Sequence, residues 1–192
     1  MNFTLAKAAR RAYILFMGSE LIQIRGGTRS DALEVARVHE EAWRSTYQGI
    51  IPHLHLEKII AHRGPGWWER TLKRPSSGML LLTFNGTVQG YASFGAARIA
   101  SSPKTGEIFE LYLAPVFQGM GFGKQLFLSA RRVLQRQGRR RLVVWALAEN
   151  EPACAFYGRL GGTPSVSAPE HYGSVTLNRL AFVWEPVSRA TR

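Results

Sequence analysis

Residues 110–124 have the residue types and spacing best suited to binding an anion. An apolar run reaches Pro115, and three glycines at alternate positions, Gly119, Gly121 and Gly123, then lead directly into a helical pattern. Glycines permit backbone angles that other residues avoid and leave no side chains in the way, so successive N–H groups can converge at the start of a helix. We therefore expect a strand, a turn and a helix that form an anion site, most naturally for phosphate.

Two common phosphate-binding patterns do not fit this turn. A P-loop requires a glycine five positions before Gly123 and a Ser or Thr after Lys124, but Gln118 and Gln125 occupy those places. A dinucleotide fingerprint requires its third glycine three residues after the second, whereas the glycines here alternate strictly. Taken alone, the stretch also fits a tight turn without a ligand.

The spacing Gln-x-x-Gly-x-Gly, formed by Gln118, Gly121 and Gly123, resembles the acyl-CoA pyrophosphate loop of the GNAT N-acetyltransferase family. A second motif follows at a suitable separation: Asn150-x-x-Ala-x-x-Phe-Tyr157, with two glycines shortly after it. It resembles the closing motif of GNAT enzymes, whose asparagine approaches the pantetheine arm and whose tyrosine lies near the thioester sulfur. The two motifs occur in the order typical of the family.

The resemblance implies the fold. We expect the α/β (α+β) GNAT fold, with a single central mixed, mostly antiparallel sheet flanked by helices, and a β-bulge and splayed strands that form the acetyl-CoA cleft. Residues 43–52 are similar to the first-helix region of the RimI-type and phosphinothricin-type subgroup. In the strand before the turn, the apolar residues Ile108, Leu111 and Leu113 slip by one position against strict alternation, which a β-bulge would produce.

The periodicity and the capping residues predict the other elements. Asn85-Gly86 is the strongest hairpin signal, because it suits a type I′ turn. The expected strands cover residues 21–25, 79–84, 87–94, 107–113, 142–147, 174–177 and 180–184, the last two as a final pair; the expected helices cover 31–47, 54–61, 67–73, 121–137 and 150–160, and a loop covers 101–104.

The resemblance implies acetyl-CoA as cosubstrate and transfer of its acetyl group to a primary amine. A protonated amine must lose a proton before it attacks, so a base is required. Our candidate is Glu110, with Glu107 as the runner-up; the alternative for Glu110 is a carboxylate simply paired with an arginine. Tyr157 can donate a proton to the departing thiolate, and its alternative is core packing.

Further residues are expected to hold the cofactor. The amides of the glycine turn would bind the pyrophosphate, a lysine would add charge, and a backbone N–H freed by the bulge would polarise the thioester carbonyl. The expected cofactor-binding residues are Leu111, Leu113, Gln118, Gly119, Met120, Gly121, Phe122, Gly123, Lys124 and Asn150.

Composition predicts one domain. The 192 residues are 45% hydrophobic, and no apolar run is long enough to span a bilayer. Residues 1–20 are basic and read as a flexible N-terminal extension, which leaves 21–192 as the N-acetyltransferase domain. The single cysteine, Cys154, is compatible with a reducing compartment, and we expect a cytoplasmic protein without a membrane partner.

The acceptor and other partners stay open at this level. The acceptor is a small-molecule or protein amine, and Glu40, Glu41, Trp43 and Tyr47 would suit a cation. Trp67 and Trp68 could also line an acceptor pocket or belong to the core. His53 and His55 are not accompanied by a cysteine or a cluster of carboxylates, which favours a solvated loop, so we expect no metal.

Three further possibilities concern the partners, the activity and the oligomeric state of the protein. The net charge is +12, and six arginines lie between positions 131 and 141, which leaves a nucleic-acid or ribosomal partner open beside a solvated helix face. A GNAT fold that binds acyl-CoA without catalysis is a second alternative. A homodimer is the third, as is common among GNAT relatives.

Overall fold

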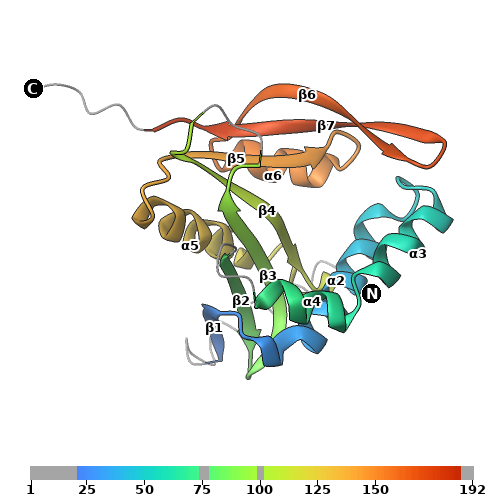
Figure 1. The fold of residues 1–192 in the computed structure, drawn as a ribbon, viewed down its shortest axis with the longest axis horizontal. Coiled ribbons are helices and arrows are strands. Elements are labelled where there is room, and N and C mark those ends of the chain that lie inside the picture. The colour runs from blue at the N-terminus through green and yellow to red at the C-terminus, as the bar shows by residue number, and fades with distance from the viewer. Residues whose placement is uncertain (1–20, 74–77, 99–101, 187–192) are drawn as a thin grey trace, which may run out of the picture.

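A computed structural model describes residues 21–73, 78–98 and 102–186. The expected extension over 1–20 and the first residue of the expected loop 101–104 lie outside these ranges. The rest folds around one seven-stranded sheet whose order is β1-β2-β3-β4-β5-β7-β6 (Figure 1). Every neighbouring pair is antiparallel except β4 and β5, which are parallel. The strands are β1 (Ile22–Gly26), β2 (Gly78–Phe84), β3 (Thr87–Ala96), β4 (Thr105–Leu113), β5 (Arg141–Leu147), β6 (Thr163–Tyr172) and β7 (Val175–Trp184).

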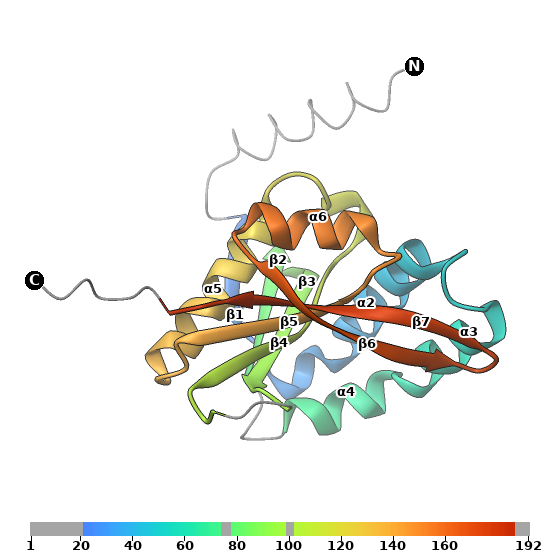
Figure 2. The ribbon, with the colours of Figure 1, turned by 90° about the horizontal axis from the view of Figure 1, so that it is seen from above.

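Helices cover both faces of the sheet. The helix α5 contacts β2, β3 and β4, while α2 contacts β3 and β4 and also α3 and α4 (Figures 1 and 2). The helix α6 packs beside β5. In the described ranges, no helix is long and apolar enough to cross a bilayer. The helices are α2 (Ala32–Tyr47), α3 (His53–His62), α4 (Pro65–Leu72), α5 (Phe122–Arg136) and α6 (Glu151–Arg159), with short 3-10 turns at Arg29–Asp31 and Pro115–Phe117.

The expected hairpin and helices are confirmed to within two residues at their ends. Asn85 and Gly86 both have positive φ, at 49° and 81°, as a type I′ turn between β2 and β3 requires. The helix α5 turns its apolar side toward the sheet, where Leu126, Phe127 and Leu134 are almost completely buried. This packing fixes the helix that begins at the glycine turn.

The predicted final strand pair is wrong in its assignment. The two runs 174–177 and 180–184 form one continuous strand, β7, and its partner is β6. No sequence pattern indicated β6, because this strand contains Pro164 and Pro169 and lacks an apolar alternation. It lies at the edge of the sheet and is mostly exposed, which is where a strand tolerates proline.

The expected β-bulge and splayed strands are confirmed. In the β3–β4 ladder, Ser93 faces Glu110 and Phe94 faces Ile108, so Phe109 is the extra residue. The parallel pairing of β4 with β5 stops at the pair Ile108 and Val144. Beyond that pair the two strands diverge and leave a gap in the middle of the sheet.

Asp31 supports the entry into α2. Its carboxylate accepts two hydrogen bonds from Arg25, at 2.6 and 2.9 Å, and others from the backbone and hydroxyl of Thr28, at 2.8 Å each. The hydrogen bond from Arg25 is the main reason why the pKa of Asp31 falls to about 2, and the bonds from Thr28 lower it further against the opposing effect of burial. The ionised carboxylate therefore stabilises the folded chain.

Replacing this carboxylate tests that contribution. Because Arg25 is partly exposed, we expect Asp31→Asn to lower the free energy of unfolding by about 1–2 kcal/mol at neutral pH. The pKa of Asp31 is lower in the folded chain than its value near 4 in the unfolded chain. The stabilisation by its carboxylate is therefore fully present at pH values above 4 and is lost as the pH falls toward 2. The difference from wild type should shrink by about half at pH 3 in urea unfolding. The exposed, ion-paired Glu40→Gln should change little at either pH, and a gap that stays constant with pH would contradict the assignment.

Candidate active site

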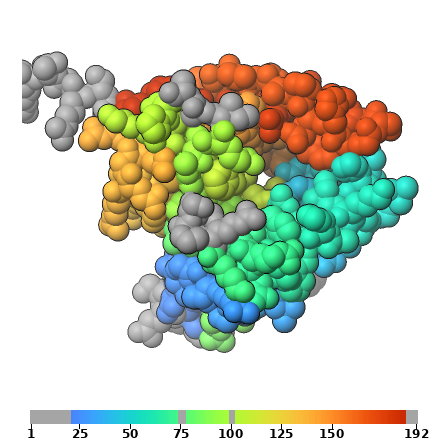
Figure 3. Space-filling view, viewed as in Figure 1, coloured from blue at the N-terminus to red at the C-terminus, as the bar shows by residue number. Residues whose placement is uncertain are grey.

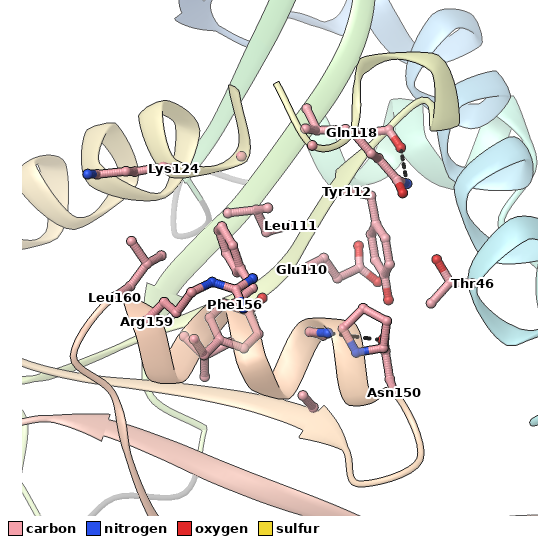
Figure 4. A pocket seen from close by; sticks show the side chains of 18 of the residues that line it. Thr46, Glu110, Leu111, Tyr112, Gln118, Lys124, Asn150, Phe156, Arg159 and Leu160 are labelled. Atoms are coloured by element: carbon pink, nitrogen blue, oxygen red, sulfur yellow. Dashed lines mark hydrogen bonds between the residues drawn. The ribbon is translucent and has the colours of Figure 1, made fainter. Parts of the chain in front are cut away.

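A cavity of about 630 Å³ lies in the gap between β4 and β5 and extends to the glycine turn and α6 (Figure 4). Most of the residues expected to hold the cofactor or to catalyse transfer line it, and they come from three stretches of the chain, 110–113, 118–124 and 150–157. The expected residues that line it are Glu110, Leu111, Leu113, Gln118, Gly119, Gly121, Gly123, Lys124, Asn150 and Tyr157. Met120 and Phe122 do not line it with their side chains.

The backbone of the glycine turn presents free donors to this cavity. No N–H group of residues 119–124 donates a hydrogen bond to another described residue; the first amide of the turn and helix that does so is that of Gln125. Gly119 and Gly121 have φ of 72° and 89°, a conformation that other residues rarely adopt. A Cβ on Gly123 would lie 3.5 Å from the Phe156 ring across the cavity. The turn is therefore a narrow cradle of N–H groups at the start of α5, which fits a phosphate group.

Side chains hold this turn in place. Met120 and Phe122 are buried in the main core, so of these two predicted residues only the backbone can face a ligand. The side-chain amide of Gln118 donates a 3.1 Å hydrogen bond to the carbonyl of Leu113 (Figure 4). This bond ties the turn to the end of β4, so Gln118 positions the turn in addition to lining the cavity.

The hydrogen bond between Gln118 and Leu113 indicates the direction in which the amides of β4 point. The carbonyl of Leu113 points toward Gln118, whereas the N–H of Ala114 donates to Gln89 at the end of β3. The N–H and C=O of one strand residue point to the same side, and this side alternates along the strand. The N–H groups of Leu111 and Leu113 therefore face the gap, where they can donate to a bound carbonyl.

The second motif forms the opposite wall. Asn150 caps α6, and its side-chain oxygen accepts a 3.2 Å hydrogen bond from the N–H of Ala153 (Figure 4). Arg159 in the last turn of this helix also lines the cavity, although it was not among the residues expected there. Its spacing of three residues from Phe156 would have placed it on the same helix face. Thr46 of α2 is a second lining residue; it lies within the first-helix region 43–52, but nothing in the sequence distinguished it from its neighbours there.

Tyr157 is buried among aromatic rings but borders the cavity. Its ring contacts those of Phe127, Phe156, Phe182 and Trp184. Its surroundings are therefore compatible both with core packing and with the expected role as a proton donor at the cavity. Burial raises the pKa of its hydroxyl above the ordinary value near 10. The hydroxyl therefore stays protonated at neutral pH and is available as a donor.

Glu110 lies on the cleft side of β4, as expected of a base, and its carboxylate is also paired with an arginine, as the alternative interpretation expected. Its carboxylate forms an ion pair with Arg63, at the end of α3, and only 12% of its side chain is exposed. Glu107 differs, because it is buried in the paired part of β4, accepts hydrogen bonds from the side chain and backbone of Arg98, and lines neither cavity.

A second cavity of about 380 Å³ adjoins the first, and both are lined by Tyr47, Glu110 and Tyr112. The surface is hollowed at this place, between the β6–β7 layer and helices α3 and α4 (Figure 3). The hydroxyls of Tyr47 and Tyr112 are 2.8 Å apart at the junction. The four rings expected at an acceptor pocket, Trp43, Tyr47, Trp67 and Trp68, all line this cavity, and three of them are also buried in the core.

Other charged residues lie away from both cavities. Glu40 and Glu41, which the sequence suggested for a cationic acceptor, are exposed and pair with Arg44 and Arg37 on α2. In the basic segment, Arg141 pairs with Glu185, and others are exposed. Within the described ranges, no group of three metal-ligand side chains is close enough to hold an ion. Cys154 donates weakly to the carbonyl of Leu147 and packs beside the core, and burial raises its pKa.

Comparisons with known proteins agree with this geometry. Residues 35–162 match the family model described as "Acetyltransferase (GNAT) family". The chain is 28% identical over 171 residues to an uncharacterized N-acetyltransferase, YuaI, of Bacillus subtilis. This match covers 88% of this chain and 95% of the relative. It is 27% identical over 134 residues to a mycothiol acetyltransferase of an Arthrobacter species, where the match spans 39% of the relative.

Solved structures share the fold. The PaiA N-acetyltransferase of Thermoplasma acidophilum, in complex with coenzyme A, superposes with a TM-score of 0.72 at 21% identity, covering 85% of this chain and 98% of that one. YncA of Salmonella typhimurium, a putative acetyltransferase with acetyl-CoA, gives 0.64 at 22% identity and covers 89% and 97%.

The chain belongs to the GNAT acetyltransferase family, since the family model covers two thirds of its length. As a member it is an acetyl-CoA-dependent N-acetyltransferase, with acetyl-CoA as its cosubstrate. The open amides of residues 119–124 and the narrow space above Gly123 fit the phosphate groups of such a ligand.

Filling the cradle tests this fit. In Gly123→Val the added methyl groups would occupy the space between α5 and Phe156, and the φ of Gly123 is not positive, so the backbone accepts the change. We expect the Kd for acetyl-CoA to rise at least about tenfold in calorimetry, equivalent to about 1.4 kcal/mol. The control Gln125→Val, on the exposed side of the same helix turn, should bind as wild type does. Equal affinities in the two variants would place the phosphates elsewhere.

Proposed function

We propose that this enzyme transfers the acetyl group of acetyl-CoA directly to a primary amine that enters through the second cavity. One observation carries the proposal: the two cavities meet at the bulged strand β4, where Glu110 and Tyr112 line both of them. A cosubstrate in the larger cavity and an amine in the smaller one would face each other at this junction. Direct attack needs such a geometry, because both reactants must be bound together.

The larger cavity would hold the cosubstrate. The amides of residues 119–124 would bind the pyrophosphate, with Lys124 and Arg159 as cations that line the same space. Asn150 would flank the pantetheine arm. When bound, acetyl-CoA supplies an acetyl thioester whose carbonyl carbon accepts the amine and whose thiolate departs. The N–H groups of Leu111 and Leu113 would donate to the carbonyl oxygen as its negative charge develops.

The chain's own side chains would move the protons. Amines have pKa values of about 8 to 10.4, so the acceptor enters largely protonated and must lose a proton. Glu110 would accept this proton, directly or through one water, because it lies at the junction of the cavities. The hydroxyl of Tyr157 would donate a proton to the departing sulfur. The nitrogen loses its second proton to solvent as the tetrahedral adduct collapses, the acetamide and CoA with a protonated thiol then leave, and Tyr157 regains its proton from Glu110.

Glu110→Gln tests the base. The amide keeps the size of the side chain and a hydrogen-bond acceptor for Arg63, but it cannot take a proton. We expect kcat/KM for the amine to fall by about 10² to 10⁴, while the Kd for acetyl-CoA stays within about threefold, as measured by CoA release and calorimetry.

The matched control is Glu107→Gln, on the same strand and also paired with an arginine, but outside both cavities. Its kcat/KM should follow that of wild type once the folded fraction is measured. Full activity of Glu110→Gln together with loss of activity in Glu107→Gln would transfer the role to Glu107. Binding of acetyl-CoA without turnover of any amine would instead support the non-catalytic alternative.

Tyr157→Phe tests the acid. The ring and its aromatic contacts remain, so we expect unchanged thermal stability and a fall in kcat of about 10- to 10²-fold. Because burial raises the pKa of Tyr157, wild-type activity should not decline through ionisation of this group below pH 10. The fall should therefore be similar at pH 7 and pH 9. Activity of Tyr157→Phe equal to that of wild type would exclude the hydroxyl as the donor.

A further inference from the structure

We propose that the acceptor is a small zwitterion, an amine that carries a carboxylate on the same molecule, with the carboxylate bound by Arg63 and the amine by Glu110. This inference rests on the proposed function, because it requires that the second cavity holds the acceptor. Its basis is the state of Arg63 within that cavity.

The size and walls of the cavity fit a small molecule. Its volume of about 380 Å³ lies at the lower end of the range for ligand pockets. Helices α2 and α4 contribute the rings of Trp43, Trp67 and Trp68, and the end of β6 contributes Tyr172. An apolar side chain of the acceptor would pack against these rings.

Arg63 is held in position by these same rings. Its guanidinium carbon lies 4.9 Å from the centre of the Trp67 ring and 5.5 Å from that of Trp43. About a quarter of its side chain is exposed. The stacking orients the guanidinium in the cavity wall and reduces the entropy that a ligand would otherwise have to remove.

Most hydrogen-bond donors of Arg63 are unused. One nitrogen pairs with Glu110, and no other hydrogen bond joins its guanidinium to a described residue. None of its nitrogens is enclosed without a partner, and Arg63 lines the cavity, so the remaining donors are accessible to a ligand there. A guanidinium with free N–H groups binds a carboxylate through two parallel hydrogen bonds.

The other two arginines of the cavity differ. Arg98 directs two nitrogens to Glu107, which lies outside the cavity, and its side chain is 60% exposed. Arg179 pairs with Glu170 at 3.1 Å and stacks on Trp145. In these pairs the carboxylate partner is not the proposed base. Of the three arginines, Arg63 alone is paired with the carboxylate that is proposed as the base, Glu110.

This sharing determines which acceptor fits. An ammonium that approaches Glu110 competes with Arg63 for one carboxylate, and a monoamine would leave a partly buried guanidinium without an anion, which is unfavourable. A zwitterion supplies its own carboxylate to Arg63 while its ammonium takes Glu110. Two ion pairs then replace one, and the net charge of the site does not change. A site built around such a pair rejects analogues that lack one of the two charges.

The test compares amino acids with their decarboxylated amines: leucine with 3-methylbutylamine, phenylalanine with 2-phenylethylamine, and methionine with 3-(methylsulfanyl)propylamine. With wild type and acetyl-CoA, we expect kcat/KM to be at least 30-fold higher for the better amino acids than for their partners. In Arg63→Gln this ratio should fall to about one, mainly through a higher KM for the amino acid. Arg63→Lys, which keeps the charge without the planar fork, should fall between them.

Arg98→Gln is the matched control, since Arg98 lines the same cavity but points its donors to Glu107. Its ratio should equal that of wild type. Binding supplies a readout independent of turnover: 3-phenylpropanoate, which has the carboxylate but no amine, should compete with phenylalanine for wild type and bind at least tenfold more weakly to Arg63→Gln in calorimetry. Melting temperatures verify that each variant is folded.

The outcomes separate this inference from the proposed function. Turnover of decarboxylated amines or of lysine side chains in peptides at rates equal to or above those of the amino acids would overturn the zwitterion while the acetyltransferase reaction stands. So would turnover of none of the amino acids, or a preference that Arg63→Gln retains. Failure of the wild-type protein to bind acetyl-CoA, or full activity of Glu110→Gln, would overturn the proposed function itself.

Discussion

The separation of β4 from β5 is the constraint on which the rest of the site depends. The extra residue Phe109 shifts the ladder with β3 by one position, and the pairing with β5 ends one residue before it. Backbone groups that would bond to a neighbouring strand are freed there, which is normally unfavourable in a protein interior. The gap becomes useful because the free amides of Leu111 and Leu113 face it and because the glycine turn follows at its end.

An aromatic cluster between α2, α4 and the strands β3 and β4 supports this opening. His39 of α2 shares a 2.8 Å hydrogen bond with Tyr91 of β3, and its ring contacts those of Trp43, Trp68 and Tyr112. Burial lowers the pKa of His39 to about 3, so it stays neutral and acts as a packing and hydrogen-bonding group. The cluster fastens α2 and α4 to β3 and β4, and thereby sets the distance between the rings that enclose the smaller cavity.

Local sequence signals predicted much of the fold. The Asn85-Gly86 hairpin and the glycine turn could be read because each depends on backbone angles that few residues adopt. The bulge left a trace as a slip in the apolar pattern. Strand β6 left none, since an exposed edge strand needs neither apolar alternation nor every N–H group.

The smaller cavity was only partly predictable for a related reason. Its rings could be proposed from the first-helix region, but the pairing of Arg63 with Glu110 joins positions 47 residues apart, and only the packing of α3 against the sheet brings them together. The spacing of three residues places Arg159 on the same helix face as Phe156, but only the structure shows that this face of α6 borders the cavity. Contacts between distant segments depend on tertiary structure, which a motif in one segment does not record.

A crystal structure of the enzyme with coenzyme A and a carboxylate-bearing acceptor would test the central claim most directly, namely that two ligands meet at Glu110. We predict phosphate oxygens within hydrogen-bond distance of the N–H groups of residues 119–124, and the thiol end between Leu111 and Tyr157. The amine of the acceptor should lie in the smaller cavity beside Glu110. Phosphates bound away from the glycine turn, or an acceptor amine that reaches the thiol from a side other than the smaller cavity, would contradict the account.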